Sequence, residues 1–498
     1  MKRSDGSSTQ PQTLLCLALS LLLLLAGCAT RPLNPPITHV DLNAGYRFVT
    51  RPQYSANNED LVILAFSGGG TRAAAFSYGV LEFLRNTTVV GPNGGRSRLL
   101  DRVGVITGVS GGSFTALAYG LYGDRLFDDY EQRFLKRNVQ GEIISRSLNP
   151  IYWSSLASRG WGRSELAADL YDQILFGGAT FADLNRGAGP FIVVSATDIS
   201  TGSSLPFNQF TFDLLCSDLG AVRLSRAAAA SSAVPVVLSP VTLNNYGGTC
   251  DYTPPSWARA IVDSVNTPRS AARAMRRAQE RMELEDSVNR PYIHLVDGGV
   301  SDNLGMLGVL DTLELMDLLY STGQPSPLDH IKRIIVFIVN AVSSPKTDWD
   351  KKETPPGTLQ ILLKAATVPI DRYSYEATER LLDIQSRWRT IRRLRESPTF
   401  TTAKKDRKSG EALRTPEAKI YAIDVSFAQL IDPAERDYLN QLPTSLSLPA
   451  EAVDRLRAAA GQIIIESPEF QRLLKDVGGS IVVAPSQAAA SKATPVGK

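Results

Sequence analysis

The chain has 498 residues, long enough for more than one folding unit. Its 53 lysines and arginines nearly balance its 50 aspartates and glutamates, and the net charge of +3 gives no strong field that would favour nucleic acid as a partner. Hydrophobic residues make up 43% of the chain, an ordinary share for a globular protein, which excludes wholesale disorder. The bulk properties therefore predict a globular body without a nucleic-acid partner.

The N-terminus has the layout of an export signal. A short positive region, Lys2-Arg3, precedes a nearly continuous apolar run over residues 14–26, which is short for a membrane-spanning helix and typical of a secretory signal peptide. The run ends in Leu25-Ala-Gly-Cys28, and these four positions resemble the bacterial lipobox, in which the cysteine receives diacylglycerol before cleavage. The alternative is an uncleaved helix that anchors the chain in a membrane.

The resemblance to a lipobox implies that residues 1–27 are removed and that the mature chain is anchored to lipid through Cys28. Ala29 stands where an inner-membrane retention signal usually has aspartate, which favours the outer membrane of a bacterial envelope. In such an oxidising compartment the two cysteines of the body, Cys216 and Cys250, could form a disulfide. They could equally be separate buried thiols, because the sequence does not give the distance between them.

Apolar runs that end in glycine-rich or polar turns predict the strands of the body, and segments with helical periodicity lie between them. Alternating strands and helices imply an α/β fold with a mostly parallel central sheet flanked by helices, in which chemistry gathers at the carboxyl ends of the strands. The predicted strands are residues 61–66, 102–107, 191–194, 292–296, 334–339 and 419–425.

Composition divides the chain further. A proline-rich polar stretch is typical of a tether, a stretch rich in arginine and glutamate indicates a helical surface insertion, and the Ala/Ser/Pro-rich end predicts a disordered tail. After about residue 345 the pattern becomes largely helical, which predicts a helical C-terminal extension. The resulting organisation is a signal peptide at 1–27, a tether at 28–57, an α/β domain at 58–345 with the insertion at 256–290, a helical C-terminal region at 346–483 and a tail at 484–498.

The sharpest local motif is Gly108-Val-Ser110-Gly-Gly112, at the point where a predicted strand gives way to a helix. A G-x-S-x-G sequence in this setting forms a tight turn that presents the serine hydroxyl at the top of the sheet, with the amide of Gly111 facing the reacting carbonyl. A looser match around Ser77 lies inside a helical segment and lacks the turn, so we interpret Ser77 as a packing residue. Ser110 is therefore the candidate nucleophile.

A second glycine motif, Ser67-Gly-Gly-Gly-Thr-Arg72, ends the first predicted strand and opens a helix. Consecutive glycines let backbone amides converge on one point, and the N-terminus of the helix adds positive potential, so the loop can hold an oxyanion or a phosphate. The glycine spacing also fits a dinucleotide-binding fingerprint, but that fingerprint requires an acidic residue about 20 residues further on. Residues 89–97 contain no acid. We therefore interpret the loop as the oxyanion hole for Ser110.

Candidate bases for Ser110 are few, because the chain has three histidines. His39 lies in the predicted tether, and His330 precedes a strand without a glycine turn beside it. His294 is three residues from Asp297, an odd offset that sends the two side chains to opposite faces of one strand. Asp297 closes that strand and precedes two glycines, the same placement as the serine. An aspartate before Gly-Gly is also common in ordinary turns, so the residues alone leave both interpretations of Asp297 open.

Three motifs in order, GGGTR at 68–72, GVSGG at 108–112 and DGG at 297–299, resemble the patatin-like phospholipase family over about residues 60–345. The resemblance implies a catalytic dyad without histidine. Ser67 and Ala73 depart from the family pattern, but neither position supplies a reacting group. The site residues that the resemblance implies are Ser110 and Asp297 in the dyad, Gly68, Gly69, Gly70, Arg72 and Gly111 at the oxyanion hole, Gly108 and Gly112 at the nucleophile turn, and Gly298 and Gly299 after the aspartate.

The same resemblance implies a lipid acyl hydrolase of the phospholipase A or esterase type, which cleaves carboxylic esters of membrane glycerolipids through an acyl-enzyme. No metal or organic cofactor is expected, and three histidines without clustered cysteines leave a metal hydrolase short of ligands. Two alternatives remain open. One is an acyltransferase or thioesterase that uses the same dyad, and the other is a non-catalytic envelope lipoprotein that uses the fold to bind a partner.

Overall fold

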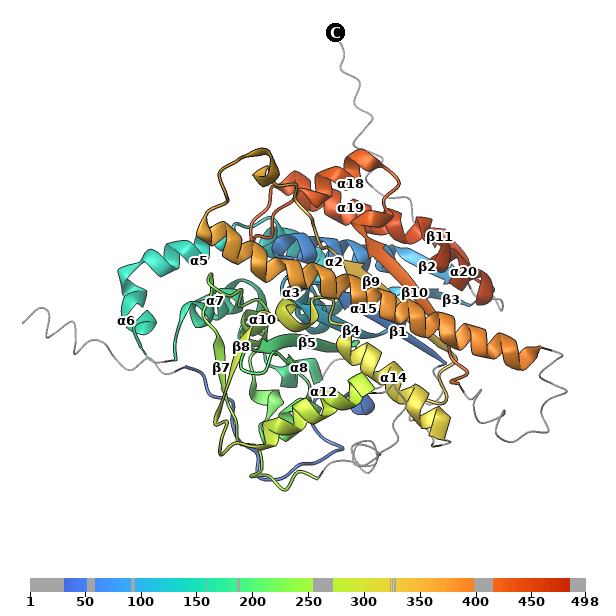
Figure 1. Cartoon of the computed structure of the whole chain (residues 1–498), viewed down its shortest axis with the longest axis horizontal. Helices are drawn as coiled ribbons and strands as arrows, with labels where there is room; N and C mark the ends of the chain where they lie inside the picture. The colour runs from blue at the N-terminus through green and yellow to red at the C-terminus, as the bar shows by residue number, and fades with distance from the viewer. Residues whose placement is uncertain are drawn as a thin grey trace, which may run out of the picture.

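The computed structural model describes residues 31–51, 59–90, 95–158, 160–185, 189–253, 272–322, 328–397 and 415–483, together with residues 324 and 326. The predicted signal peptide, Cys28, the predicted tail after residue 483 and residues 256–271 of the predicted insertion lie outside this part of the chain. Figure 1 shows a central sheet with helices packed on both of its faces. No helix in the described ranges is long and apolar enough to cross a membrane.

The strands form a main sheet and a smaller one. The main sheet contains β1 Asp60–Phe66, β4 Val103–Val109, β5 Phe191–Asp198, β6 Ser204–Pro206, β7 Val241–Asn244, β8 Tyr292–Val296, β9 Arg333–Asn340 and β10 Lys419–Ser426. Its strand order is β10-β9-β1-β4-β5-β8-β7, with β6 paired to β5. The first five strands of that order are parallel, whereas β8 is antiparallel to both β5 and β7. The smaller sheet is antiparallel, in the order β11 Ser480–Val483, β2 Thr87–Val90 and β3 Arg96–Arg98.

Helices fill most of the remaining described chain. Those before the middle of the chain are α2 Gly70–Asn86, α3 Gly111–Tyr122, α4 Leu126–Tyr130, α5 Val139–Leu148, α6 Trp153–Leu156, α7 Arg163–Tyr171, α8 Phe181–Asn185, α9 Gln209–Leu214 and α10 Leu224–Ser231. Those after it are α12 Ala272–Met282, α13 Gly299–Asp302, α14 Leu307–Thr322, α15 Thr358–Glu396, α18 Pro433–Asn440, α19 Ala450–Glu466 and α20 Pro468–Asp476. α12 is the described helix of the predicted charged insertion.

Strand β1 explains why helices cover both faces of the sheet. Val62, Leu64 and Phe66 belong to the core cluster that includes α2, α3 and α19, whereas Ile63 and Ala65 belong to the cluster that includes α14 and α15. A strand that is apolar on both faces has to be buried on both faces, which is typical of parallel sheets. The α/β fold and all six predicted strands are therefore confirmed.

The C-terminal region is largely helical, as predicted, but it also completes the main sheet. β10 pairs with β9 in parallel over its whole length, from Lys419 opposite Arg333 to Ser426 opposite Asn340. The helix α19 packs against α2, one of the helices that cover the main sheet. The predicted boundary near residue 345 therefore does not divide two folding units, because the sheet continues across it.

The prediction that residues 28–57 form a tether is wrong for the part that the structure describes, residues 31–51. Tyr46 is buried, and its hydroxyl accepts the amide of Ile192 at 2.7 Å. Arg47 donates to both carboxylate oxygens of the buried Asp213, at 2.7 and 3.0 Å. Burying one member of such a pair alone would be costly, so this ion pair fixes the segment to the body. Residues 31–51 are thus part of the folded domain.

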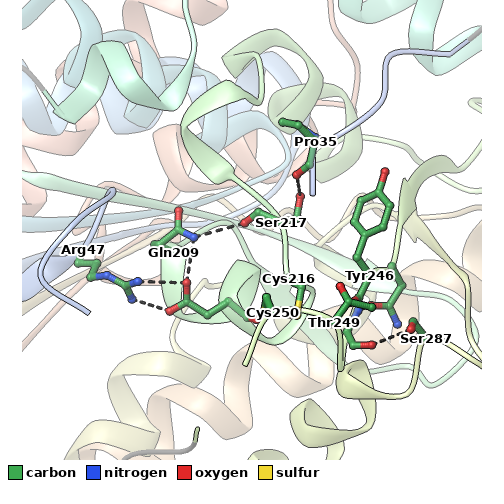
Figure 2. Close-up of a disulfide and its surroundings, with 12 residues drawn as sticks. Pro35, Arg47, Gln209, Cys216, Ser217, Tyr246, Thr249, Cys250 and Ser287 are labelled. Carbon is green, nitrogen blue, oxygen red and sulfur yellow. Dashed lines mark hydrogen bonds and ion pairs between the residues drawn. A yellow bond between two sulfur atoms is a disulfide. The ribbon is translucent and has the colours of Figure 1, made fainter. Parts of the chain in front are cut away.

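The disulfide Cys216–Cys250 lies close to this ion pair (Figure 2). The Cα atoms of the two cysteines are 5.4 Å apart, within the usual range for a bridge. The amide of Ile37 donates to the carbonyl of Cys216 at 2.8 Å, so the bridge also borders the N-terminal segment. Closing a loop of 34 residues contributes about 3–4 kcal/mol of stability in the chain-entropy model.

Candidate active site

Ser110 lies in the tight turn between β4 and α3. Its backbone has φ 49° and ψ −117°, a conformation that residues with side chains rarely adopt. The neighbouring glycines are required by lack of space, because a Cβ on Gly108 would lie 2.9 Å from the Cα of Ser113. A Cβ on Gly112 would lie 2.6 Å from the carbonyl oxygen of Ser67. The turn places Ser110 at the carboxyl end of β4, where it is 6% exposed.

Asp297 follows β8 and pairs with the serine. Ser110 Oγ donates to Asp297 Oδ2 at 2.8 Å, and the amide of Gly299 donates to Oδ1 at 2.8 Å. Asp297 is 7% exposed, and this burial raises its pKa to about 6, although the two hydrogen bonds oppose the rise. A carboxylate with a raised pKa is a stronger base than a solvated one, so Asp297 is equipped to accept the serine proton.

Backbone contacts hold Asp297 in register with the serine. The amide of Asp297 donates to the carbonyl of Ala233 at 2.9 Å, and its own carbonyl accepts the hydroxyl of Thr197 at 2.9 Å. Gly298 approaches the neighbouring strand so closely that a Cβ would lie 2.2 Å from the carbonyl oxygen of Ser195. Glycine after Asp297 is therefore a requirement of strand packing as well as of the turn.

Ser231 is a site residue that the sequence analysis did not single out. Its hydroxyl accepts the amide of Ser110 at 2.9 Å and donates to the carbonyl of Ser195 at 2.7 Å. Ser231 thus supports the strained backbone of the nucleophile from a helix more than a hundred residues away in sequence. Its only sequence signal is its place in the run Ala230-Ser-Ser-Ala-Val-Pro235, a further segment that resembles the patatin-like pattern.

The glycine loop between β1 and α2 lies directly against the nucleophile. Gly69 has φ 140° and Gly70 has φ 60°, so both use backbone conformations that favour glycine. A Cβ on Gly68 would lie 3.2 Å from the Cβ of Ser110, and one on Gly111 would lie 2.0 Å from the carbonyl oxygen of Gly70. The N-termini of α2 and α3 therefore meet beside Ser110.

The amides of this loop are not equivalent. Gly68 donates its N–H to the carbonyl of Asn303 at 2.9 Å, so the prediction that its amide serves the oxyanion hole is not supported. For the amides of Gly69, Gly70 and Gly111, no acceptor is found among the described residues. The first amides of a helix lack partners within that helix and carry positive potential. These three amides can therefore stabilise a negatively charged oxygen.

Arg72, two residues after Gly70, links the glycine loop to distant segments of the chain. Its guanidinium is buried and donates to the carbonyls of Ala341 at 2.7 Å and Leu442 at 2.8 Å, and to the hydroxyl of Thr444 at 3.1 Å. Burial lowers the pKa of Arg72 to about 10, so it remains charged at neutral pH. Two of these three bonds reach the C-terminal region, and Arg72 is a positioning residue rather than an oxyanion ligand.

The histidines lie away from this arrangement, as predicted. His294 is exposed, and its Nδ1 is 3.0 Å from the hydroxyl of Thr242 on β7. His330 precedes β9, at the amino end of the parallel strands, whereas Ser110 lies at their carboxyl end. The described residues contain no group of three His, Cys, Asp or Glu side chains placed to hold a metal ion.

A cavity of about 410 Å³ lies between the main sheet and the helices α12 and α14. Apolar side chains such as Ile63, Val105 and Leu313 line most of it. Val109 lies close both to Gly305, which lines the cavity, and to Gly298, which follows the catalytic aspartate. A Cβ on Gly305 would lie 3.4 Å from one Val109 methyl group, and a Cβ on Gly298 would lie 3.0 Å from the other. Neither Ser110 nor Asp297 contributes to the described lining of the cavity.

The site combines a serine that is hydrogen-bonded to a carboxylate with backbone amides that are free to donate, at the carboxyl ends of the strands. This arrangement is suited to acyl transfer chemistry. Residues 64–310 match the family model "Patatin-like phospholipase". This stretch contains the glycine loop, Ser110 and Asp297. Residues 64–310 are therefore a patatin-like phospholipase domain, which supports lipid hydrolase activity.

The solved structures to which the chain is similar are distant in sequence. Human GIVD cytosolic phospholipase A2 is 14% identical, with a TM-score of 0.40 over 91% of this chain and 66% of that chain. The same human protein in complex with methyl gamma-linolenyl fluorophosphonate gives 13% identity and a TM-score of 0.38, over 84% of this chain and 59% of that one. VipD from Legionella pneumophila is 11% identical, with a TM-score of 0.29 over 93% and 74% of the two chains. The chain thus covers less than two thirds of the human protein, and no curated protein sequence matches it.

Gly70→Ala tests the glycine loop. Its Cβ would lie 2.3 Å from the carbonyl oxygen of Ser445, so the loop must shift away from the nucleophile. We expect kcat for a soluble carboxylic ester to fall by about 10²–10³, the usual cost of losing an oxyanion donor. Gly177→Ala is the matched control, because Gly177 has φ 58° but no atom within 4 Å of the added Cβ. Equal kcat in both folded variants would contradict a role for the loop.

The pH dependence tests Asp297. Asp297 has to be ionised to accept a proton, so kcat/KM should fall as the pH drops through about 6, rather than near the ordinary aspartate value of about 4. The measurement is a pH–rate profile on a soluble ester. A histidine base would give an acid limb in a similar range, so His294→Ala serves as the control and should keep the limb unchanged. A limb that disappears in His294→Ala would assign the base to the imidazole.

Proposed function

We propose that the protein is a lipid acyl hydrolase of the phospholipase A or esterase type, which cleaves carboxylic esters of membrane glycerolipids. The observation that carries the proposal is the 2.8 Å hydrogen bond from Ser110 Oγ to Asp297 Oδ2, beside the amides of Gly69, Gly70 and Gly111. The match of residues 64–310 to the patatin-like phospholipase family model supports a lipid ester as the substrate. The residues present need no metal or organic cofactor for this reaction.

The first half-reaction forms an acyl-enzyme. Ser110 Oγ attacks the ester carbonyl carbon while its proton passes to Asp297 Oδ2, and the carbonyl electrons move onto the oxygen. The three amides hold this oxyanion in a site that excludes most water. The bond to the leaving alcohol then breaks, and Asp297 returns the proton to the alcohol oxygen.

The second half-reaction releases the acyl group. Asp297 accepts a proton from water as the water oxygen attacks the acyl carbon, and the same amides hold the second oxyanion. The bond between the acyl carbon and Ser110 Oγ breaks, and the proton returns from Asp297 to the serine. A fatty acid leaves, and both residues regain their starting states.

Substitution of the two residues tests the dyad. Ser110→Ala should abolish both hydrolysis and covalent labelling by a fluorophosphonate, with a loss of about 10⁴-fold or more in kcat. Asp297→Asn keeps the shape of the side chain but cannot accept the proton, so we expect a loss of roughly 10²–10⁴-fold. His294→Ala is the control on the same strand segment and should retain activity. Labelling of Ser110→Ala to the wild-type level would place the nucleophile elsewhere, and a wild-type protein that neither labels nor hydrolyses esters would be a non-catalytic scaffold.

We also propose that the mature chain is a lipoprotein of a bacterial envelope, anchored through Cys28. The support is the Leu25-Ala-Gly-Cys28 sequence after a short apolar run, with Ala29 favouring the outer membrane. A cysteine that carries three acyl chains binds a membrane far more strongly than a single chain, because each buried CH₂ contributes about 0.8 kcal/mol.

Cys28→Ala tests the anchor. The variant should accumulate as an unprocessed precursor, because the lipid-accepting thiol is missing. The measurement is metabolic labelling with a radioactive fatty acid, together with the apparent mass of the protein and its fractionation between membranes. Cys216→Ala, which removes a cysteine of the disulfide, should still be lipid-labelled and processed. Processing of Cys28→Ala like the wild type would refute lipidation at this residue.

A further inference from the structure

Large apolar side chains are exposed along α5, α6 and the turn that joins them. Leu148, Ile151 and Trp153 are 70%, 78% and 56% exposed, and Ile144 is also more than half exposed. Exposed apolar residues scattered singly over a surface are normal, but a gathered set marks a surface that meets a partner.

Two further segments, distant in sequence from α5 and α6, also expose apolar side chains. Val236 and Val237 lie in the turn after α10 and are more than half exposed. Ile361 and Leu362, in the first turns of α15, are 48% and 53% exposed, and Val368 follows on the same helix. We call the exposed apolar side chains within residues 144–153, 236–237 and 361–368 the apolar rim.

The segments that carry the apolar rim are almost free of charge. Residues 139–158 contain one acidic and one basic residue, residues 358–371 likewise, and residues 234–239 none. The far end of α15 is different, since residues 387–396 contain five arginines and one glutamate. A single helix therefore changes from an apolar, uncharged start to a highly charged end, which indicates that only its start faces an apolar partner.

Hydrogen bonds through residues 445 and 446 connect α5 to the glycine loop beside Ser110. The amide of Gln140 donates to the carbonyl of Leu446 at 3.2 Å, and the hydroxyl of Ser445 donates to Gln140 Oε1 at 2.9 Å. The carbonyl of Ser445 in turn accepts the amide of Thr71 at 2.8 Å. The helix that starts the apolar rim is thus one short segment away from the amides beside Ser110.

The other two segments are continuous with residues that lie close to the catalytic aspartate or to the glycines after it. The turn with Val236 follows Ala233, whose carbonyl accepts the amide of Asp297 at 2.9 Å. On α15, Ile370 lies 3.7 Å from the position of a Cβ on Gly299. In Figure 1, α5 and α6 lie on one side of the molecule, and α15 begins on that same side. The apolar rim therefore belongs to the part of the surface that adjoins the active site.

Arg31, the first described residue after the proposed lipid anchor, contacts the same segments. Arg31 donates to the carbonyl of Thr242 at 3.0 Å, and its Cδ lies 3.1 Å from the position of a Cβ on Gly160, a few residues after α6. Arg163, just beyond, donates to the carbonyl of Val236 at 3.1 Å. In the sequence, Cys28 is three residues before Arg31.

We propose that the apolar rim is a docking surface for a lipid bilayer, which brings the Ser110 site onto lipids in that bilayer. The proposal rests on the proposed function. A bilayer fits better than a protein partner because the apolar rim adjoins a site for lipid esters and lies on the side of the proposed lipid anchor. Its scarcity of charge and its exposed tryptophan also suit the boundary between headgroups and acyl chains.

Docking would change how the substrate reaches the serine. A glycerolipid that leaves a bilayer through water exposes its acyl chains, which is strongly unfavourable. An enzyme seated on the surface by an apolar rim offers the lipid an apolar path into the site. Hydrolysis of lipids in a bilayer should therefore depend on the apolar rim, whereas hydrolysis of a soluble ester should not.

The first experiment compares two double variants of the full chain. Ile151→Gln with Ile361→Gln removes apolar surface from the apolar rim, where these residues are 78% and 48% exposed. The control, Ile431→Gln with Leu394→Gln, changes residues that are 73% and 49% exposed outside it. On phosphatidylethanolamine–phosphatidylglycerol vesicles we expect the first pair to lose about tenfold or more in rate and the control to keep it. Both pairs should hydrolyse a soluble short-chain ester at the wild-type rate.

The second experiment measures contact with the bilayer without turnover. In a Ser110→Ala background, vesicles with brominated acyl chains should quench tryptophan fluorescence, and Trp153→Phe should remove the largest part of that quenching. Absence of quenching from Trp153, together with equal vesicle rates for the two double variants, would overturn the docking surface while leaving the hydrolase intact. Quenching without hydrolysis of any ester by the wild type would instead overturn the proposed function alone. A wild-type dimer that becomes monomeric in the Ile151→Gln, Ile361→Gln variant, with unchanged vesicle rates, would assign the apolar rim to a second copy of the chain.

Discussion

The buried pairing of Ser110 with Asp297 is the interaction on which the rest of the structure depends. A carboxylate that is 7% exposed loses most of its hydration, and it is compensated by the serine hydroxyl and the Gly299 amide, each at 2.8 Å. The two partners are 187 residues apart and follow different strands, β4 and β8, on either side of β5. Only a rigid sheet can hold their oxygen atoms at this distance, so the apolar strands, the close-packed glycines and the hydroxyl of Ser231 all serve one contact.

The same constraint explains why the C-terminal region is inseparable from the site. The family match ends at residue 310, yet Arg72 bonds to Leu442 and Thr444, and the amide of Thr71 bonds to Ser445. A loop with two consecutive glycines at positive φ is flexible by itself, because glycine loses more conformational freedom on folding than any other residue. The C-terminal segment supplies the contacts that fix this loop, so the amides beside Ser110 are positioned by residues far outside the matched domain.

Much of this could be predicted from local sequence. The six strands, the turn at Ser110, the position of Asp297 at the end of its strand and the opposite orientation of His294 follow from apolar runs, glycine spacing and strand parity, which act over a few residues. The pairing of Asp297 with Ser110 was implied only by the family resemblance. Three features could not be predicted, since each depends on contacts between distant segments. They are the hydrogen bond of Ser231 to the Ser110 amide, the bond of the Gly68 amide to the carbonyl of Asn303, and the bond of the Arg72 side chain to Leu442. The predicted tether differed for a related reason: composition does not show that Arg47 finds a buried partner in Asp213.

That packed N-terminal segment has a consequence for how the protein would sit on a membrane. With residues 31–51 fixed to the body by the Arg47 ion pair and by contacts around the disulfide, only Ala29 and Thr30 separate the proposed anchor from Arg31. A long flexible tether would let the body rotate freely and sample the bilayer with any face, whereas a two-residue link restricts it to the faces near Arg31. The apolar rim and the active site adjoin those faces. Under the two proposals, anchor and rim would act as two attachment points whose effective concentrations reinforce one another, and a weak docking surface would then be sufficient to orient the enzyme.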